Sequence, residues 1–130
     1  MKQPRSNPEH QLQSRVREYL GWCLPAEVEW TASLVGTNLS VNARNRAKAA
    51  GVRPGWPDLQ FLFPDGVTRY IELKAPEGSL RPEQRAFRDR CAPHGIWAVC
   101  RSVEEVEATL RGWGARLRNH PFREAPLLAA

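Results

Sequence analysis

The order of patterned segments in this chain of 130 residues predicts an α/β fold, a mixed sheet covered by helices. Two observations carry the prediction. Strand-like apolar runs flank the turn Pro64-Asp65-Gly66, which indicates an antiparallel hairpin. A helical pattern then separates that hairpin from a later strand over residues 96–100, so this strand can join the sheet in parallel through a right-handed crossover.

Each element follows from its periodicity and its end signals. An apolar stripe at helical spacing predicts a helix over residues 9–22, and the next apolar run predicts a strand over 28–34. A short helix over about 42–50 ends at Gly51, a residue that favours helix termination. The hairpin spans 59–75. Helices are predicted over 81–91 and, from the cap Ser102, to about 118.

Composition bounds the class of protein. With 42% hydrophobic and 25% charged residues, we expect one self-sufficient domain over 1–118, and an extended or disordered tail over 119–130. No apolar run is long enough for a membrane span or a signal peptide, so we expect a soluble, intracellular protein. A net charge of +5 favours a polyanionic partner. The cysteines are odd in number and widely spaced, which indicates neither a disulfide framework nor a zinc site. They are Cys23, Cys91 and Cys100.

The predicted hairpin carries the most informative spacing, Pro-Asp before its first strand and Glu-x-Lys at the end of its second. If the turn is centred on its aspartate, the numbers of paired residues sum to about 130 or 131. That register sets Asp58 opposite Glu72, or one residue off. Strand alternation puts Glu72 and Lys74 on one face, with Ile71 and Leu73 on the other. Two carboxylates and an ammonium group therefore converge.

Like-charged carboxylates on a half-buried hairpin are costly unless something compensates them. Mg²⁺ prefers one or two carboxylates together with waters and phosphate oxygens, a set that Asp58 and Glu72 could supply. Lys74 would then hold or orient the attacking water. Of the 19 basic residues only Lys2, Lys48 and Lys74 are lysines, so an ordinary surface cation here would be expected to be arginine. In the alternative, Asp58 caps a strand and the other two are solvated on an exposed sheet face.

The chain contains G-x-x-P-G-x-P-D-L from Gly51, I-E-L-K up to Lys74, and Gln84 soon after. Through these residues it resembles the VRR-NUC family of the PD-(D/E)xK nuclease superfamily. The resemblance extends over about 8–113 and includes E-x-x-L-Q from Glu9. The resemblance implies a restriction-endonuclease-like core and a Mg²⁺- or Mn²⁺-dependent endonuclease. The residues it assigns to the site are Asp58, Glu72, the carbonyl of Leu73 and Glu9 on the metal, Lys74 on the water and Gln84 beside them.

Two of these residues also have an ordinary structural interpretation. Gln84 lies on the apolar face of its helix and could satisfy its amide on a neighbouring strand's backbone. Glu9 fits a capping box with Ser6 as the cap, a role compatible with joining the metal site at another stage. Glu18, on the opposite face of that helix, is a weaker candidate for the metal.

Basic residues gather on one face of the helix predicted over 81–91. Arg81, Arg85 and Arg88 form this stripe, and Arg44 with Lys48 forms a weaker patch upstream. Such stripes are commonly solvated faces. Beside a phosphodiesterase site, we expect them to contact DNA. Trp56, next to Asp58, could stack on a DNA base or pack against a partner subunit, and the sequence leaves its role open.

The resemblance implies a structure-selective enzyme acting on branched DNA, in the cytoplasm of a bacterial cell or a phage-infected host. Resolving a Holliday junction needs two symmetric incisions and each chain has one site, so a homodimer is expected. One alternative is a flap- or end-directed subunit of a larger repair machine. Another is a basic DNA-binding module without catalysis, which the retention of all three motif residues disfavours.

Overall fold

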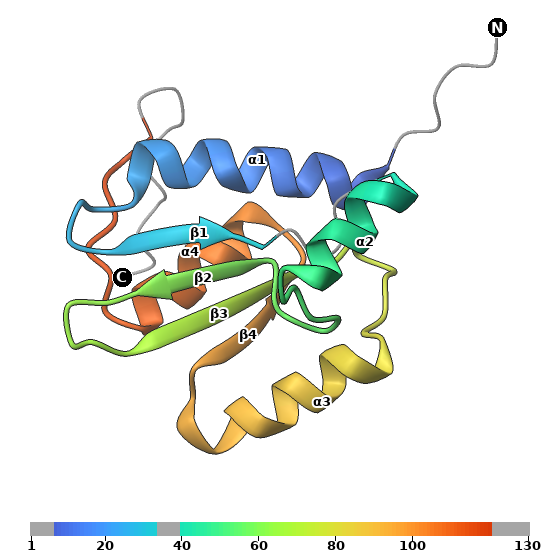
Figure 1. The fold of residues 1–130 in the computed structure, drawn as a ribbon. Coiled ribbons are helices and arrows are strands. Elements are labelled where there is room, and N and C mark those ends of the chain that lie inside the picture. Colours follow the sequence, from blue (N-terminus) through green and yellow to red (C-terminus); the bar gives the residue numbers. More distant parts are fainter. Residues whose placement is uncertain (1–6, 34–39, 121–130) are drawn as a thin grey trace, which may run out of the picture.

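The computed structural model describes residues 7–33 and 40–120. Four strands form one mixed sheet in the order β1-β2-β3-β4, and helices cover it (Figure 1). The strands are β1 (Glu29–Ala32), β2 (Leu59–Leu62), β3 (Thr68–Leu73) and β4 (Trp97–Cys100). The helices are α1 (Pro8–Cys23), α2 (Val41–Ala49), α3 (Pro82–Cys91) and α4 (Val103–Gly112), with a 3-10 turn at Ala92–His94. The predicted α/β class and mixed sheet are confirmed.

The sheet has the predicted connections. β2 pairs with β1 and with β3 in antiparallel fashion, whereas β3 and β4 are parallel and are joined through α3. Leu59 lies opposite Ile71, which is the register predicted from the turn. The turn itself is closed locally, because the Val67 N–H donates to Asp65 Oδ1 at 2.9 Å. A short-range signal therefore sets the relative position of the two strands that carry the motif.

The core lies between the sheet and the pair α1 and α4 (Figure 1). Phe61 and Ile71 are fully buried on that face of the sheet, together with Val16 of α1 and Val106 of α4. Because side chains alternate along β3, Glu72 points to the opposite face, which α3 covers. The sheet thus separates the apolar core from the face that carries Glu72.

Two helix ends differ from the prediction. α4 ends at Gly112 rather than near 118. Just after Gly112 the chain turns through Gly114, which has φ of 96°. α1 is capped by Asn7, whose side-chain oxygen accepts the His10 N–H at 3.2 Å. The predicted cap Ser6 lies outside the described residues.

Some expectations concern residues outside the described ranges. β1 ends at Ala32, earlier than the predicted 34, and residue 34 lies outside the described residues. The same holds for residues 121–130 of the predicted tail. Among the described helices, none combines the length and the apolar character that spanning a bilayer demands.

Candidate metal centre

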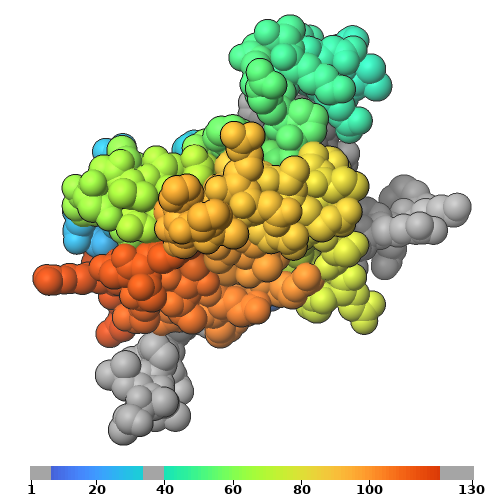
Figure 2. Space-filling model, turned by 90° about the horizontal axis from the view of Figure 1, so that it is seen from below, coloured from blue at the N-terminus to red at the C-terminus, as the bar shows by residue number. Residues whose placement is uncertain are grey.

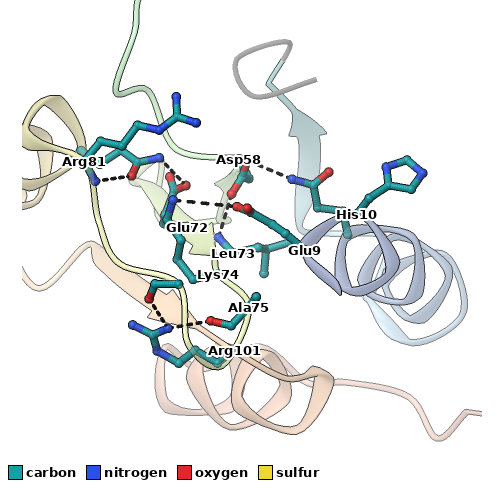
Figure 3. A network of polar contacts seen from close by, with 12 residues as sticks. Glu9, His10, Asp58, Glu72, Leu73, Lys74, Ala75, Arg81 and Arg101 are labelled. Carbon is teal, nitrogen blue, oxygen red and sulfur yellow. Dashed lines mark hydrogen bonds and ion pairs between the residues drawn. The ribbon is translucent and has the colours of Figure 1, made fainter. Parts of the chain in front are cut away.

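Three carboxylates from separate parts of the chain meet at one end of the sheet. Glu9, Asp58 and Glu72 each bring an oxygen to within 4.8 Å of the others. Glu9 comes from the first turn of α1, Asp58 directly precedes β2, and Glu72 lies near the end of β3 (Figure 3). The structure therefore brings together the three acidic residues that the sequence singled out for a metal.

The hairpin fixes the inner pair of carboxylates. Asp58 Oδ2 accepts the backbone N–H of Leu73 at 2.7 Å, so this side chain is tied to the neighbouring strand. Asp58 is 9% exposed, Glu72 2% and Lys74 6%. The alternative in which Glu72 and Lys74 are solvated on an exposed sheet face is therefore wrong, although Asp58 does satisfy a strand N–H.

Gln84 links α3 to this pair. Its Nε2 donates to Glu72 Oε1 at 2.9 Å, and its Oε1 accepts the backbone N–H of Arg81 at 2.8 Å. The amide is satisfied without the backbone of a neighbouring strand. Gln84 thereby holds the Glu72 carboxylate in one orientation at the start of α3.

Glu9 faces the cluster rather than the start of its own helix. Its Oε1 lies 3.8 Å from Lys74 Nζ, and Figure 3 shows the side chain reaching from α1 toward the end of β3. Because Asn7 caps α1, Glu9 does not need to serve as the partner of a cap. Glu18 lines a separate cavity between α1 and the start of α4, away from this cluster.

The inner carboxylates of the cluster are costly to ionise together in the metal-free protein. Glu72 Oε2 is buried and has no hydrogen-bond partner among the described residues. Burial, and then the nearby Asp58 carboxylate, raise the pKa of Glu72 to about 9. Burial also raises the pKa of Asp58, against the hydrogen bond from Leu73. Oxygen donors that are costly to ionise together, one of them unpartnered, fit a hard divalent cation.

A cavity of about 80 Å³ opens onto these groups. Since one water occupies about 30 Å³ in the liquid, the cavity has room for an ion with some of its waters. One wall is the loop at Gly55, which abuts α3: a Cβ there would lie only 2.5 Å from the Glu83 carbonyl oxygen. The lining residues are Glu9, Pro54, Gly55, Trp56, Asp58, Glu72, Lys74, Arg81, Glu83 and Gln84.

Comparison with known proteins shows the family and the fold of this chain. The family model described as the VRR-NUC domain matches residues 5–104. The chain belongs to the VRR-NUC family. A solved structure named as a VRR-NUC domain has the same fold, with 20% sequence identity, a TM-score of 0.53, and coverage of 83% of this chain and 99% of that one. No curated protein matches the chain. VRR-NUC is a nuclease family, which implies DNA as the substrate.

Two polar residues of this VRR-NUC domain support the cluster without having been predicted to do so. Gln13 Nε2 lies 3.5 Å from Asp58 Oδ1, and its spacing of four from Glu9 was the available signal. Arg101 Nη1 donates to the carbonyl oxygens of Ala75 and Gly78, both at 2.7 Å, and so braces the loop that follows Lys74 (Figure 3). No sequence pattern reports such a contact, because the partners are backbone groups at least 23 residues away.

The predicted arginine stripe on α3 is not uniform. Arg81 lines the cavity. Arg85 donates to the Leu80 carbonyl oxygen at 2.7 Å, and Arg88 pairs with Asp89 at 3.0 Å. Arg81 is therefore the member of the stripe placed at the candidate site, while the other two already have partners.

Trp56 is half-buried and packs on the face of the sheet that α3 covers. Its ring makes edge-to-face contacts with Tyr70 and Phe87, at centroid distances of 6.0 and 4.9 Å. Such contacts anchor the loop that leads to Asp58 between β3 and α3. Trp56, whose role the sequence left open, therefore has a structural role.

Proposed function

We propose that this VRR-NUC domain is a Mg²⁺- or Mn²⁺-dependent endodeoxyribonuclease whose active site is the cavity at Asp58, Glu72 and Lys74. One observation carries the proposal: three carboxylates converge on this cavity, and a buried Glu72 oxygen remains without a partner beside a buried lysine. A purely DNA-binding module gains nothing from such a pair of buried carboxylates.

Each residue has a distinct task in this proposal. Asp58, Glu72, the Leu73 carbonyl and Glu9 would hold the cation, which, when bound, supplies charge stabilisation at the phosphate and acidifies a coordinated water. Gln84 occupies one oxygen of Glu72, which leaves the other oxygen for the cation. Lys74, whose ammonium group is oriented by Glu9, holds the attacking water.

Branched DNA is the substrate that we propose. Arg81 stands at the cavity to meet the phosphate backbone, and Arg85, Arg88, Arg44 and Lys48 extend the basic surface along the flanking duplex. One chain carries one such site, so cutting both strands of a Holliday junction requires two chains. We therefore propose a homodimer that resolves four-way junctions.

The test is cleavage of a panel of four-way junction, flap, duplex and single-stranded DNA with Mg²⁺ or Mn²⁺. We expect cleavage by the unaltered protein, with the junction preferred. Asp58→Ala should lower the rate at least about 100-fold, because charge stabilisation of the transition state is lost, while DNA affinity is unchanged. Glu27→Ala removes an exposed acidic residue and serves as the control. Metal-dependent cleavage by the Asp58→Ala protein would refute the assignment of the site.

A further inference from the structure

Helix α2 makes little contact with the rest of the chain that the structure describes. None of its side chains is buried, and Figure 2 shows it projecting from the body of the molecule, beyond α3. Its end is capped by Ser40 Oγ, which accepts the Ala43 N–H at 3.2 Å. Isolated helices shorter than about 12 residues are marginal in water, because nucleation is costly. A helix of 9 residues in which no side chain is fully buried therefore receives little stabilisation from the rest of the described chain.

The charge of α2 and of the turn after it identifies the chemistry of that partner. Residues 41–53 contain four cations and no acidic residue: Arg44, Arg46, Lys48 and Arg53. Within the part of the chain that the structure describes, these four side chains form no hydrogen bond or ion pair, in contrast to Arg69 and Arg111. Val41 is the sole large apolar residue in the helix sequence, so this surface does not offer an apolar interface. Unneutralised cations on an exposed helix fit a polyphosphate backbone.

The C-terminal end of α2 is connected by a short segment to the candidate active site. After the helix, the chain passes through Pro54, Gly55 and Trp56, which line the cavity, and reaches Asp58. Trp56 is held between Tyr70 and the helix α3. Only residues 50–53 separate α2 from the lining residue Pro54, so a DNA strand bound at the cavity is within reach of α2.

We propose that α2 is a DNA-binding arm: the duplex that flanks the scissile phosphate covers it, and binding stabilises its helical form. This inference rests on the proposed function, because it takes DNA as the substrate. In this arrangement, binding of the flanking duplex is coupled to formation of the α2 helix, a role that the arginines of α3 do not have.

The charge contribution is tested with two triple variants that remove the same net charge. One changes α2: Arg44→Gln, Arg46→Gln and Lys48→Gln. The other changes exposed arginines that do not line the cavity: Arg15→Gln, Arg111→Gln and Arg116→Gln. Binding of a fluorescent four-way junction is measured by anisotropy in EDTA over a salt series.

We expect the α2 variant to bind at least about tenfold more weakly, and its slope of log affinity against log salt to fall by about two to three, since each lost phosphate contact removes about 0.9. The control should change the slope by less than about one. Equal losses in both variants, or no loss in the α2 variant, would overturn the proposal.

Helix formation is tested at Asn45, an exposed residue in the middle of α2. Alanine is a better helix former and proline interrupts the helix. Asn45→Ala should tighten DNA binding about two- to threefold and Asn45→Pro should weaken it at least tenfold. Both should unfold thermally like the unaltered protein, because no side chain of α2 is fully buried. Similar binding by the two variants, or weaker binding by both, would contradict coupling between binding and helix formation.

The binding measurements distinguish failure of the DNA-binding arm from failure of the proposed nuclease function. If the unaltered protein binds no DNA, the proposed function and the arm fail together. If it binds DNA and the α2 variants bind equally well, only the arm fails. Light scattering on the α2 triple variant tests whether a second copy of the protein, instead of DNA, binds to α2. A change in oligomeric state with an unchanged salt slope would make α2 a contact between protein copies and would overturn its assignment to DNA.

Discussion

At the scale of single residues, Glu72 is the side chain whose surroundings most require another charge. It is 2% exposed, Gln84 satisfies one of its oxygens, and the other has no partner among the described residues. The neighbouring Asp58 carboxylate adds to the cost of ionisation. In the metal-free protein these effects favour a protonated Glu72, and a bound cation would reverse that preference.

This electrostatic cost predicts how stability depends on pH in EDTA. The pKa of Glu72 is about 9 in the folded protein and near 4.5 when unfolded. Between these values the folded chain holds a proton on Glu72 that the unfolded chain has lost, so the contribution of Glu72 to stability is greatest below the unfolded pKa and falls as pH rises toward 9. The slope should be at most about 1.4 kcal/mol per pH unit.

Urea denaturation at a series of pH values measures this dependence. Glu72→Gln should flatten the pH profile and leave the protein more stable than the unaltered chain near pH 8. Glu27→Gln, at an exposed position, should leave the profile as it is. Stability that rises over this range, or that falls equally in Glu72→Gln, would contradict the account of Glu72.

The sequence predicted the members of the site better than their contacts. Asp58 and Glu72 could be paired from sequence because a local turn sets the register between their strands. Gln84 was conspicuous as an amide on an apolar helix face, yet its partner depends on how α3 crosses the sheet. Arg101 could not be found at all, since its partners are carbonyl groups that identify no residue type.

At the scale of elements, predictions succeeded where a local stop signal is strong. The hairpin turn is such a signal, whereas the end of α4 was placed too late. Ala115 and Leu117 pack on the core from non-helical backbone, so apolar character continues past the helix. The glycine at 114 was the signal that marked the end.

The contact between the Gly55 loop and α3 gives a second prediction. Gly55 has φ of 87° and Gly51 has φ of 99°, so alanine is strained at both positions, but only at Gly55 would the added Cβ meet another atom, the Glu83 carbonyl oxygen. Gly51→Ala should cost about 1–2 kcal/mol of unfolding free energy. Gly55→Ala should cost about 1–3 kcal/mol more.

Chemical denaturation of both variants separates backbone strain from the steric contact. Gly55→Ala should also reduce cleavage, because displacement of α3 moves Gln84 away from Glu72. Gly51→Ala should retain cleavage. Equal destabilisation by the two substitutions would show that the loop does not press against α3 as described.

At the scale of the whole molecule, one chain carries one cluster of the three motif residues. If the protein resolves four-way junctions, two copies related by a two-fold axis must act together. We expect a dimer by light scattering at micromolar concentration, and paired nicks placed symmetrically in opposing strands of a mobile junction. A monomer that cuts only flaps or ends would contradict the dimeric resolvase and leave the metal site intact.

The most direct measurement of the central claim is anomalous diffraction from crystals soaked with Mn²⁺. We expect a manganese peak between the carboxylates of Asp58 and Glu72, with Glu9 beside it, and we expect this peak to disappear in Asp58→Ala crystals soaked in the same way. A strong peak at other residues with none at this cluster, or a peak that persists in Asp58→Ala, would contradict it.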